Sequence, residues 1–394
     1  MPGSLKAVSA IARPTNAELM GRARALLPAI AARVTETNER RDLSPETVAE
    51  IRDAELFRSL QPQAWGGLEL DPRVVLDIQN VFAEVCASTA WIYGVLSVQA
   101  FFLARFSPQA QMDVWGEDPY ALVSSSFQPV SKVTPVEGGF LLSGRHTFSS
   151  GSSHCDWALL GGIVPPGEGR EAPQMRLFLV PRSDYEIVDV WHVIGLRGTG
   201  SNDIVVDEVF VPTHRTYCPD PGMLPLPASS ELPALYRLPW MHMFTSMVSN
   251  LGVGTARGAL NYFTETTRTR VAGFGNAPSR ENPVFLSAIG RVQMELDALD
   301  LVAKRNFGRL LECVDADEEM TMSEVLLYRS QLTSSMRRIS ALVDELMLLL
   351  GGRGIRTDSP LTQAWLDLHA ARSHMGNDPT ATLGQLAGEV LAGR

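Results

Sequence analysis

The sequence predicts a multi-domain α+β protein, mostly α-helical, in which a β-rich module lies between two helical regions. Apolar residues follow helical spacing before and after this module, whereas the module contains short β-branched and aromatic runs between Gly, Pro and Ser turns. A chain of 394 residues also exceeds one compact core. We therefore expect a helical domain at 1–119, a β domain at 120–218, and a helical bundle with its linker at 219–394.

The first region contains clear helix and loop signals. Ser44 precedes Pro45, the pairing of an N-cap residue with proline at the first helical position. Residues 61–67 form a loop by their Pro and Gly content. Residues 81–106 carry few charges and many Ala, Val, Leu and aromatic residues, which indicates a buried helix pair.

The middle and last regions differ in the spacing of their apolar residues. Strand-like runs occur in GGFLLSGRHTF (138–148), DWALLGGIV (156–164) and NDIVVDEVFVP (202–212), which predicts a small antiparallel sheet or barrel with a hairpin at Gly138-Gly139. Residues 325–346 instead repeat apolar side chains at helical spacing without Pro or Gly. Such long helices need partners along their whole length, so a bundle extended by neighbouring subunits is expected.

Charge and composition exclude several classes of protein. Lys and Arg number 34 against 44 Asp and Glu, and the net charge of −10 disfavours a nucleic-acid or anionic-membrane binder. We expect no signal peptide, membrane helix or metal site, and a cytoplasmic protein. The scattered cysteines are expected to be reduced thiols: Cys86, Cys155, Cys218 and Cys313.

Several motifs together, in their order, carry a family resemblance. They are QPQAWGG (61–67), CASTAW (86–91), VWGEDP (114–119), SSSF (124–127), GRHTFSSG (144–151), DVWHVIGLRGTGSN (189–202), VFVP (209–212) and HAARSHMGNDP (369–379). The chain resembles the acyl-CoA dehydrogenase superfamily over nearly its full length. Within it, the chain is most similar to oxygenase components of two-component flavin monooxygenases, such as the 4-hydroxyphenylacetate and steroid-catabolic phenol hydroxylases. The resemblance implies that fold, with a C-terminal four-helix bundle and a homotetramer.

The resemblance also implies a flavin site, FMN or FAD. The matching positions are Ser124, Ser125, Ser126, Phe148, Ser149, Ser150, Arg270, Phe274, Gly351 and Gly352. Hydroxyl groups suit the polar edge of the flavin, and Arg270 suits the phosphate of a flavin in an adjoining protomer. The alternatives are serines that satisfy local backbone groups, a solvated Arg270, and glycines that cap a helix.

Catalytic and substrate roles follow from the same resemblance. His374 is expected to face the flavin and to act as the base that activates a phenol, with Ser149 and Ser150 beside the flavin. Trp91, Tyr93 and Gln99 are expected to line the substrate pocket with His374, although aromatic residues on a buried helix are more often core.

Two of these positions leave questions open. Asp378 could orient either a helix end or the imidazole. Several phenol-hydroxylating relatives carry a histidine where this chain has Gln99, which admits indole, polyketide, amine or sulfur substrates besides phenols.

The implied reaction uses reduced flavin (FADH2 or FMNH2) and O2, through a C4a-hydroperoxyflavin, to hydroxylate a small aromatic molecule. A separate NAD(P)H:flavin reductase is implied because the chain shows no nicotinamide-binding motif. The alternatives are a flavin-linked acyl-CoA dehydrogenase or oxidase, an N- or S-oxygenating member of the same family, and a helical assembly protein without catalysis.

Overall fold

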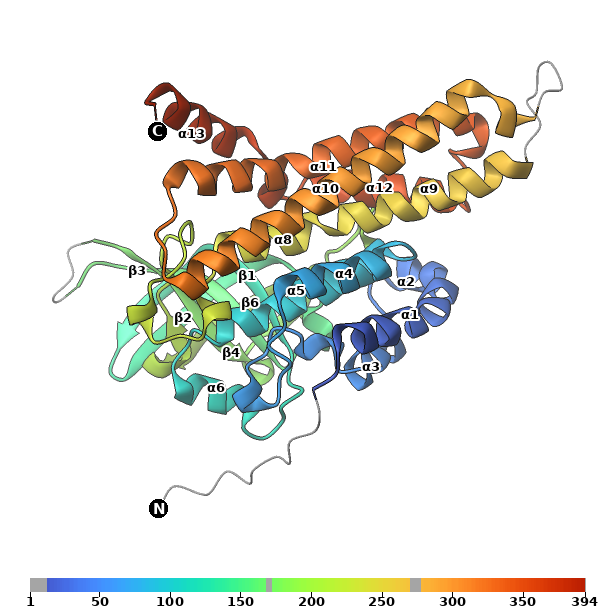
Figure 1. The fold of residues 1–394 in the computed structure, drawn as a ribbon. Coiled ribbons are helices and arrows are strands. Elements are labelled where there is room, and N and C mark those ends of the chain that lie inside the picture. The colour runs from blue at the N-terminus through green and yellow to red at the C-terminus, as the bar shows by residue number, and fades with distance from the viewer. Residues whose placement is uncertain (1–12, 168–171, 270–277, 394) are drawn as a thin grey trace.

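The computed structural model describes residues 13–167, 172–269 and 278–393. It has three parts, with the N-terminal helices and the sheet side by side beneath the long C-terminal helices (Figure 1). No described helix is both long enough and apolar enough to cross a lipid bilayer.

The N-terminal part is helical, and α5 lies at its centre. Its helices are α1 (Asn16–Ala32), α2 (Val34–Arg40), α3 (Pro45–Asp53), α4 (Pro72–Ala83), α5 (Ala87–Leu103) and α6 (Pro108–Trp115). The Ser44 hydroxyl accepts the Thr47 N–H at 3.2 Å and Pro45 is the first helical residue, as the sequence predicted. All 17 residues of α5 are buried, because α4, α8 and the sheet surround it.

The sheet has the strand order β5-β6-β2-β1-β3-β4-β7. Its strands are β1 (Val123–Val136), β2 (Gly139–Ser149), β3 (Trp157–Val164), β4 (Gln174–Pro181), β5 (Glu186–Val188), β6 (Asn202–Pro212) and β7 (Thr216–Tyr217). Gly138 has φ +79° in the turn between β1 and β2, where a hairpin was predicted. The sheet is not wholly antiparallel as predicted: β3 pairs with β1 in parallel, because the chain crosses from β2 to the other side of β1.

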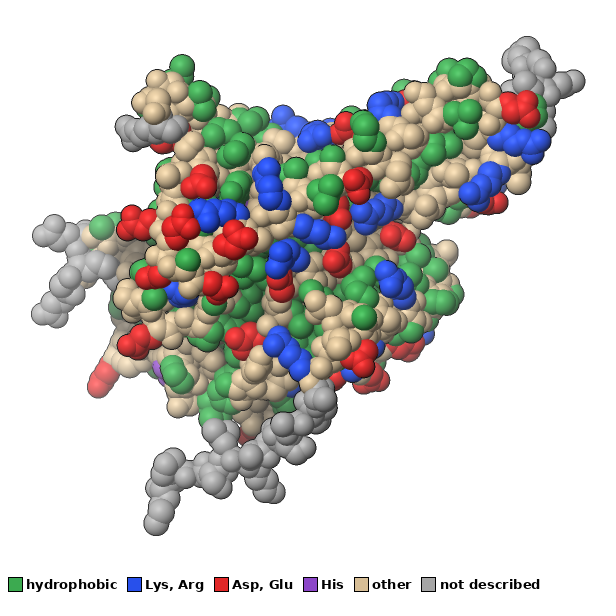
Figure 2. All heavy atoms as spheres, viewed as in Figure 1, with side chains coloured by type: hydrophobic (Ala, Val, Ile, Leu, Met, Phe, Trp, Pro, Cys, Tyr) green, Lys and Arg blue, Asp and Glu red, His purple; other side chains and the backbone are tan. Residues whose placement is uncertain are grey.

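The C-terminal part is helical again. Its helices are α7 (Ala234–Arg237), α8 (Trp240–Ser249), α9 (Leu251–Thr269), α10 (Pro283–Ala316), α11 (Met322–Leu350), α12 (Pro360–Arg372) and α13 (Thr380–Leu391). Helices α9, α11 and α12 pack on one another, and α10 runs antiparallel to α11 (Figure 1). Charges of both signs are interspersed with apolar side chains on this face of the long helices (Figure 2). Exposed Met294 and Leu301 leave part of α10 uncovered in one chain.

Two buried histidines predict how the fold responds to acid. Burial lowers the pKa of His146, inside the sheet, to about 4, and that of His242, packed against Phe307 of α10, to about 3. Between about pH 6.5 and pH 4 the unfolded chain therefore binds protons that the folded chain does not. The free energy of unfolding should fall as pH falls through this window.

Urea denaturation at a series of pH values measures the effect. His146→Gln and His242→Gln should each reduce the slope of stability against pH. A slope unchanged in both variants would contradict the assignment.

Candidate active site

The turn that follows β2 has an unusual backbone. Phe148 has φ +62° and Gly151 has φ +68°. A Cβ atom on Gly151 would lie 3.1 Å from Ile92 Cδ1, so glycine lets this turn approach α5 closely. The Gly151 N–H donates to the Thr199 carbonyl at 2.9 Å. The turn is therefore held between α5 and the loop before β6, and the Phe148 ring is left 60% exposed.

A chain of hydroxyl groups joins this turn to its neighbours. Trp91 Nε1–H of α5 donates to Ser150 Oγ at 3.1 Å. Ser150 Oγ lies 2.7 Å from Ser201 Oγ, and Ser201 Oγ lies 2.7 Å from Thr199 Oγ1. Thr199 Oγ1 donates to the Leu196 carbonyl at 3.0 Å. We call Trp91, Ser150, Ser201 and Thr199 the hydroxyl chain; Ser201 and Thr199 were not singled out by the sequence.

His374 lies just after the end of α12, directly beside the hydroxyl chain. Its ring contacts Trp91 edge-on, with 5.5 Å between ring centroids, and lies 6.1 Å from Phe244 of α8. Trp91 thus contacts both residues: its ring packs against His374 and its indole N–H donates to Ser150. The N-terminal helices, the sheet and the last helices all meet at this point.

The protonation state of His374 follows from its contacts. Burial lowers its pKa to about 4, so the imidazole is neutral at pH 7. Nδ1 accepts the Gly376 N–H at 3.0 Å, which places the single ring hydrogen on Nε2. The expectation of a base with a near-neutral pKa is not what this geometry supports, because burial lowers the pKa, no carboxylate among the described residues bonds the imidazole, and the acceptor nitrogen is occupied.

The three serines of β1 do not all lie on one face of the strand. Ser126 Oγ donates to the Thr147 carbonyl at 2.8 Å, and Ser124 faces Cys155 and Tyr185 in the interior. Strand alternation puts Ser125 on the opposite face.

Phe127 lies on the same face of β1 as Ser125, and Phe244 contacts both Phe127 and His374. The Phe127 ring lies 4.8 Å from Phe102 of α5 and 5.4 Å from Phe244. Of the three predicted serines, Ser125 is therefore the one directed toward the helices that carry the site.

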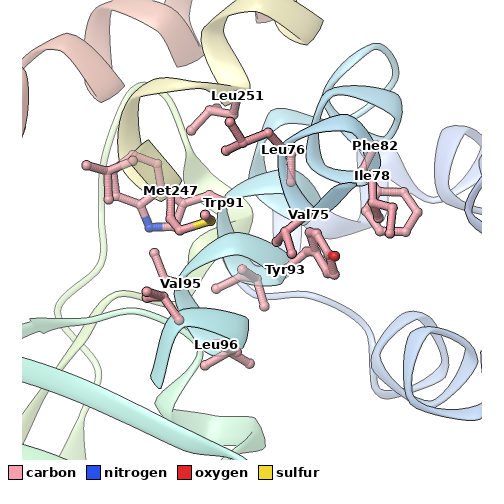
Figure 3. Packing of buried hydrophobic residues seen from close by; sticks show 14 of the residues in the cluster. Val75, Leu76, Ile78, Phe82, Trp91, Tyr93, Val95, Leu96, Met247 and Leu251 are labelled. Atoms are coloured by element: carbon pink, nitrogen blue, oxygen red, sulfur yellow. The ribbon is translucent and has the colours of Figure 1, made fainter. Parts of the chain in front are cut away.

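Helix α5 separates the predicted pocket residues. Trp91 and Tyr93 leave it on different sides, Trp91 beside Met247 and Tyr93 toward Phe82 (Figure 3). The Tyr93 hydroxyl bonds Ser59 at 3.0 Å, so this residue belongs to the helical core and does not join His374.

Gln99 lies two helical turns beyond Trp91, on the same side of α5. Its Nε2 donates to the Val95 carbonyl at 3.0 Å. Its buried Oε1 has no hydrogen-bond partner among the residues described, and the same is true of Ser149 Oγ.

The remaining predicted flavin residues lie elsewhere. Arg270 and Phe274 fall outside the described residues. Gly351 and Gly352 end α11 at the far end of the bundle, with α12 between them and His374. The 13 residues of α12 separate them by about 20 Å. These two glycines therefore do not join the site of their own chain.

A cavity of about 560 Å³ opens beside His374. It is lined by Arg337, Arg372, Ser373, His374, Met375, Asn377 and Asp378. Asp378, the carboxylate in this lining, accepts the Thr380 N–H at 3.0 Å and the Arg337 guanidinium at 3.2 Å. Asp378 therefore binds the first residue of α13 and Arg337, and does not orient the imidazole.

Asp367 is a buried acid that sequence reasoning missed. Its Oδ1 accepts the Leu196 N–H at 2.6 Å and Gln363 Nε2 at 2.9 Å, and burial raises its pKa to about 6. The carboxylate thus fastens α12 to the loop that ends the hydroxyl chain. The available signal was an acid on the apolar face of a helix, between Ala364 and Ala371.

Comparisons with known proteins agree with this geometry. Residues 246–379 match the family "Acyl-CoA dehydrogenase, C-terminal domain". The chain is 36% identical to the flavin-dependent monooxygenase oxygenase subunit HsaA of Rhodococcus jostii, over 91% of this chain and 94% of that protein. It is 31% identical to the oxygenase component of a FADH(2)-dependent resorcinol hydroxylase of a Rhizobium species, over 96% and 95%.

A solved structure supports the same conclusion. XiaF from a Streptomyces species, in complex with FADH2 and glycerol, superposes with a TM-score of 0.89 at 25% identity, covering 96% of each chain. The acyl-CoA dehydrogenase-like fold predicted from the motifs is thereby confirmed.

Removal of the Asp367 carboxylate should destabilise the protein. Asp367→Ala leaves the buried Leu196 N–H without an acceptor, which costs about 1–3 kcal/mol. Asp367→Asn keeps an oxygen acceptor and should cost less. Urea denaturation of both variants, with the exposed Asp207→Ala as control, measures this. Equal stability of Asp367→Ala and wild type would show that the contact contributes nothing.

Proposed function

The chain belongs to the oxygenase subunits of two-component flavin-dependent monooxygenases, and from this premise we propose that it hydroxylates a small aromatic substrate where Trp91, Ser150 and His374 meet. The enzyme uses reduced flavin and O2. A separate NAD(P)H:flavin reductase supplies the flavin. The observation that carries the proposal is the contact of His374 with Trp91, whose indole is in turn bound to the Ser150 hydroxyl.

The residues around Ser150 suit a flavin. Phe148 offers an exposed ring packed edge-on against Trp191 at 6.2 Å, and Ser125 and Ser150 are half-buried hydroxyls. Ser149, next to Ser150 in the sequence, adds a buried hydroxyl that has no hydrogen-bond partner among the described residues. When bound, reduced flavin supplies the activated oxygen; the protein supplies a dry apolar wall and oriented hydrogen-bonding groups.

His374 acts as a hydrogen-bond donor through Nε2. A neutral imidazole with a hydrogen on Nε2 stabilises negative charge on an oxygen atom, such as a phenolate or the oxygen being transferred. Because Nδ1 already accepts the Gly376 N–H, uptake of a proton there would break that bond. This role replaces the base that the sequence suggested.

Gln99 favours a substrate that carries a hydroxyl group. Its free Oε1 is a buried acceptor on the Trp91 side of α5, and a phenolic O–H is a matching donor. An aromatic substrate with a free hydroxyl, of the resorcinol type, satisfies this atom. An acyl-CoA dehydrogenase would need a carboxylate base, whereas the carboxylate in the cavity lining is engaged by the Thr380 N–H and the Arg337 guanidinium.

A second copy of the chain completes the flavin site. Gly351 and Gly352 are exposed and distant from His374, and Leu348 and Ile355 beside them are 82% and 73% exposed. An exposed apolar tip of this kind suits insertion into a partner. We assign this tip to the flavin site of a neighbouring protomer in a homotetramer.

Turnover with a flavin reductase, NADH and O2 tests the function. Incubation with a panel of phenols should give a product one oxygen atom heavier, measured by mass spectrometry. The absence of any flavin-dependent product across phenols, indoles and polyketide aromatics would refute the proposal.

Variants of His374 test its role as donor. His374→Leu should lower kcat by about 10²- to 10³-fold, as loss of one oriented donor does elsewhere, while reduced-flavin affinity stays within a few-fold. His374→Gln, whose amide also donates, should recover part of kcat. Wild-type kcat/KM should not fall between about pH 7 and pH 5, because the imidazole stays neutral there. A loss of activity with an apparent pKa near 6.5 would indicate a base instead.

The exposed tip can be tested by a charge. Ile355→Glu should shift the assembly to smaller species in sedimentation and weaken flavin binding, because an unpaired charge would be buried between protomers. Val130→Glu, at an apolar side chain of β1 that is 49% exposed, is the control. An unchanged assembly in Ile355→Glu would place the interface elsewhere.

A further inference from the structure

We infer that the hydroxyl chain fixes the Ser150 oxygen as a hydrogen-bond acceptor and thereby makes the site selective for reduced over oxidised flavin. The inference rests on the proposed function and concerns which redox state the site prefers. It assigns positioning roles to Ser201, which contacts Ser150, and to Thr199, which contacts Ser201.

The direction of the chain is set at its buried end. Thr199 Oγ1 lies 3.0 Å from the Leu196 carbonyl, which has no hydrogen to offer. Thr199 must therefore donate its one hydroxyl hydrogen to Leu196. The Trp191 indole donates to the same carbonyl at 3.0 Å, and the Leu196 N–H is held by Asp367, so this end cannot rotate away.

The direction in which each following hydroxyl donates its hydrogen is then determined. Thr199 has used its hydrogen, so Ser201 donates to Thr199 across 2.7 Å. Ser201 has then used its hydrogen, so Ser150 donates to Ser201 across 2.7 Å. Trp91 Nε1 is only a donor, so its bond to Ser150 agrees with this direction.

Burial keeps the direction from reversing. Thr199 and Ser201 are 1% and 4% exposed, so water does not replace a lost partner. Reversal would set the Thr199 oxygen against the Leu196 carbonyl without a hydrogen between them, a loss of one buried hydrogen bond. Ser150 itself is half-buried and keeps one lone pair free.

The two redox states of flavin differ at one ring nitrogen. N5 carries a hydrogen in reduced flavin and is a donor, whereas N5 of oxidised flavin is an acceptor. A hydroxyl that can only accept is complementary to the N5–H of the reduced form. Against the oxidised form it places an oxygen lone pair opposite the lone pair of N5, which is unfavourable. Where N5 of the bound flavin faces Ser150 Oγ, a hydroxyl held in this direction favours capture of reduced flavin from the reductase and release of oxidised flavin after turnover.

The test is the ratio of dissociation constants for oxidised and reduced flavin, the latter measured under anaerobic conditions. Ser201→Ala frees the Ser150 hydrogen, so oxidised flavin should bind tighter and the ratio should fall by about 2- to 10-fold. Thr199→Val, which removes only the anchor of the direction, should lower the ratio in the same sense by a smaller factor. The midpoint potential of bound flavin should fall in parallel, by about 30 mV for a tenfold change.

Ser88→Ala is the matched control. Ser88 accepts the Gly198 N–H at 3.2 Å, so it supports the same loop without belonging to the hydroxyl chain. The Ser88 variant should bind both redox states in the wild-type ratio. An equal change of the dissociation-constant ratio in Ser88→Ala and Ser201→Ala would show that the effect comes from loop packing and would overturn the inference.

The outcomes separate this inference from the proposed function. A wild type that binds and uses reduced flavin, but whose ratio does not change in Ser201→Ala or Thr199→Val, refutes the inference alone. A wild type that binds neither redox state refutes the proposed function as well.

Discussion

The structure depends on the complete burial of α5. This helix is enclosed along its whole length, and Gln79 of α4 ties it to α8 by donating to the carbonyls of Ala90 and Met247 at 3.1 and 2.7 Å. Gly94 permits this close approach, since a Cβ atom there would lie 2.2 Å from Gln79 Nε2. Trp91 is thereby held rigidly, and the sheet and the last helices converge on it.

The sequence predicted the fold where local signals and family motifs agreed. The cap at Ser44, the Gly138 turn and the two long helices were all visible as residue patterns. The parallel pairing of β1 with β3 was not, because it depends on which side of β1 the chain takes after β2, a choice that strand periodicity does not encode.

The site was predictable only in part, for a similar reason. The motifs at 86–91, 144–151 and 369–379 contain Trp91, Ser150 and His374, and the fold brings these three residues together. Tyr93 lies two residues from Trp91 in the sequence, but residues two positions apart on a helix point to opposite faces, so Tyr93 lies in the helical core. Ser201 and Asp367 act through contacts with distant segments, so no local pattern distinguished them.

In the proposed site, the polar groups act through hydrogen-bond direction and not through formal charge. His374 is neutral with its hydrogen on Nε2, Gln99 offers an oxygen, and Ser150 offers a lone pair. Each direction is fixed by a backbone group: the Gly376 N–H, the Val95 carbonyl and the Leu196 carbonyl. In a site of low dielectric such orientation costs no reorganisation when charge develops. A neutral, pre-oriented wall therefore suits the proposed binding of reduced flavin and a hydroxylated aromatic, because it avoids the desolvation cost that buried ions would impose.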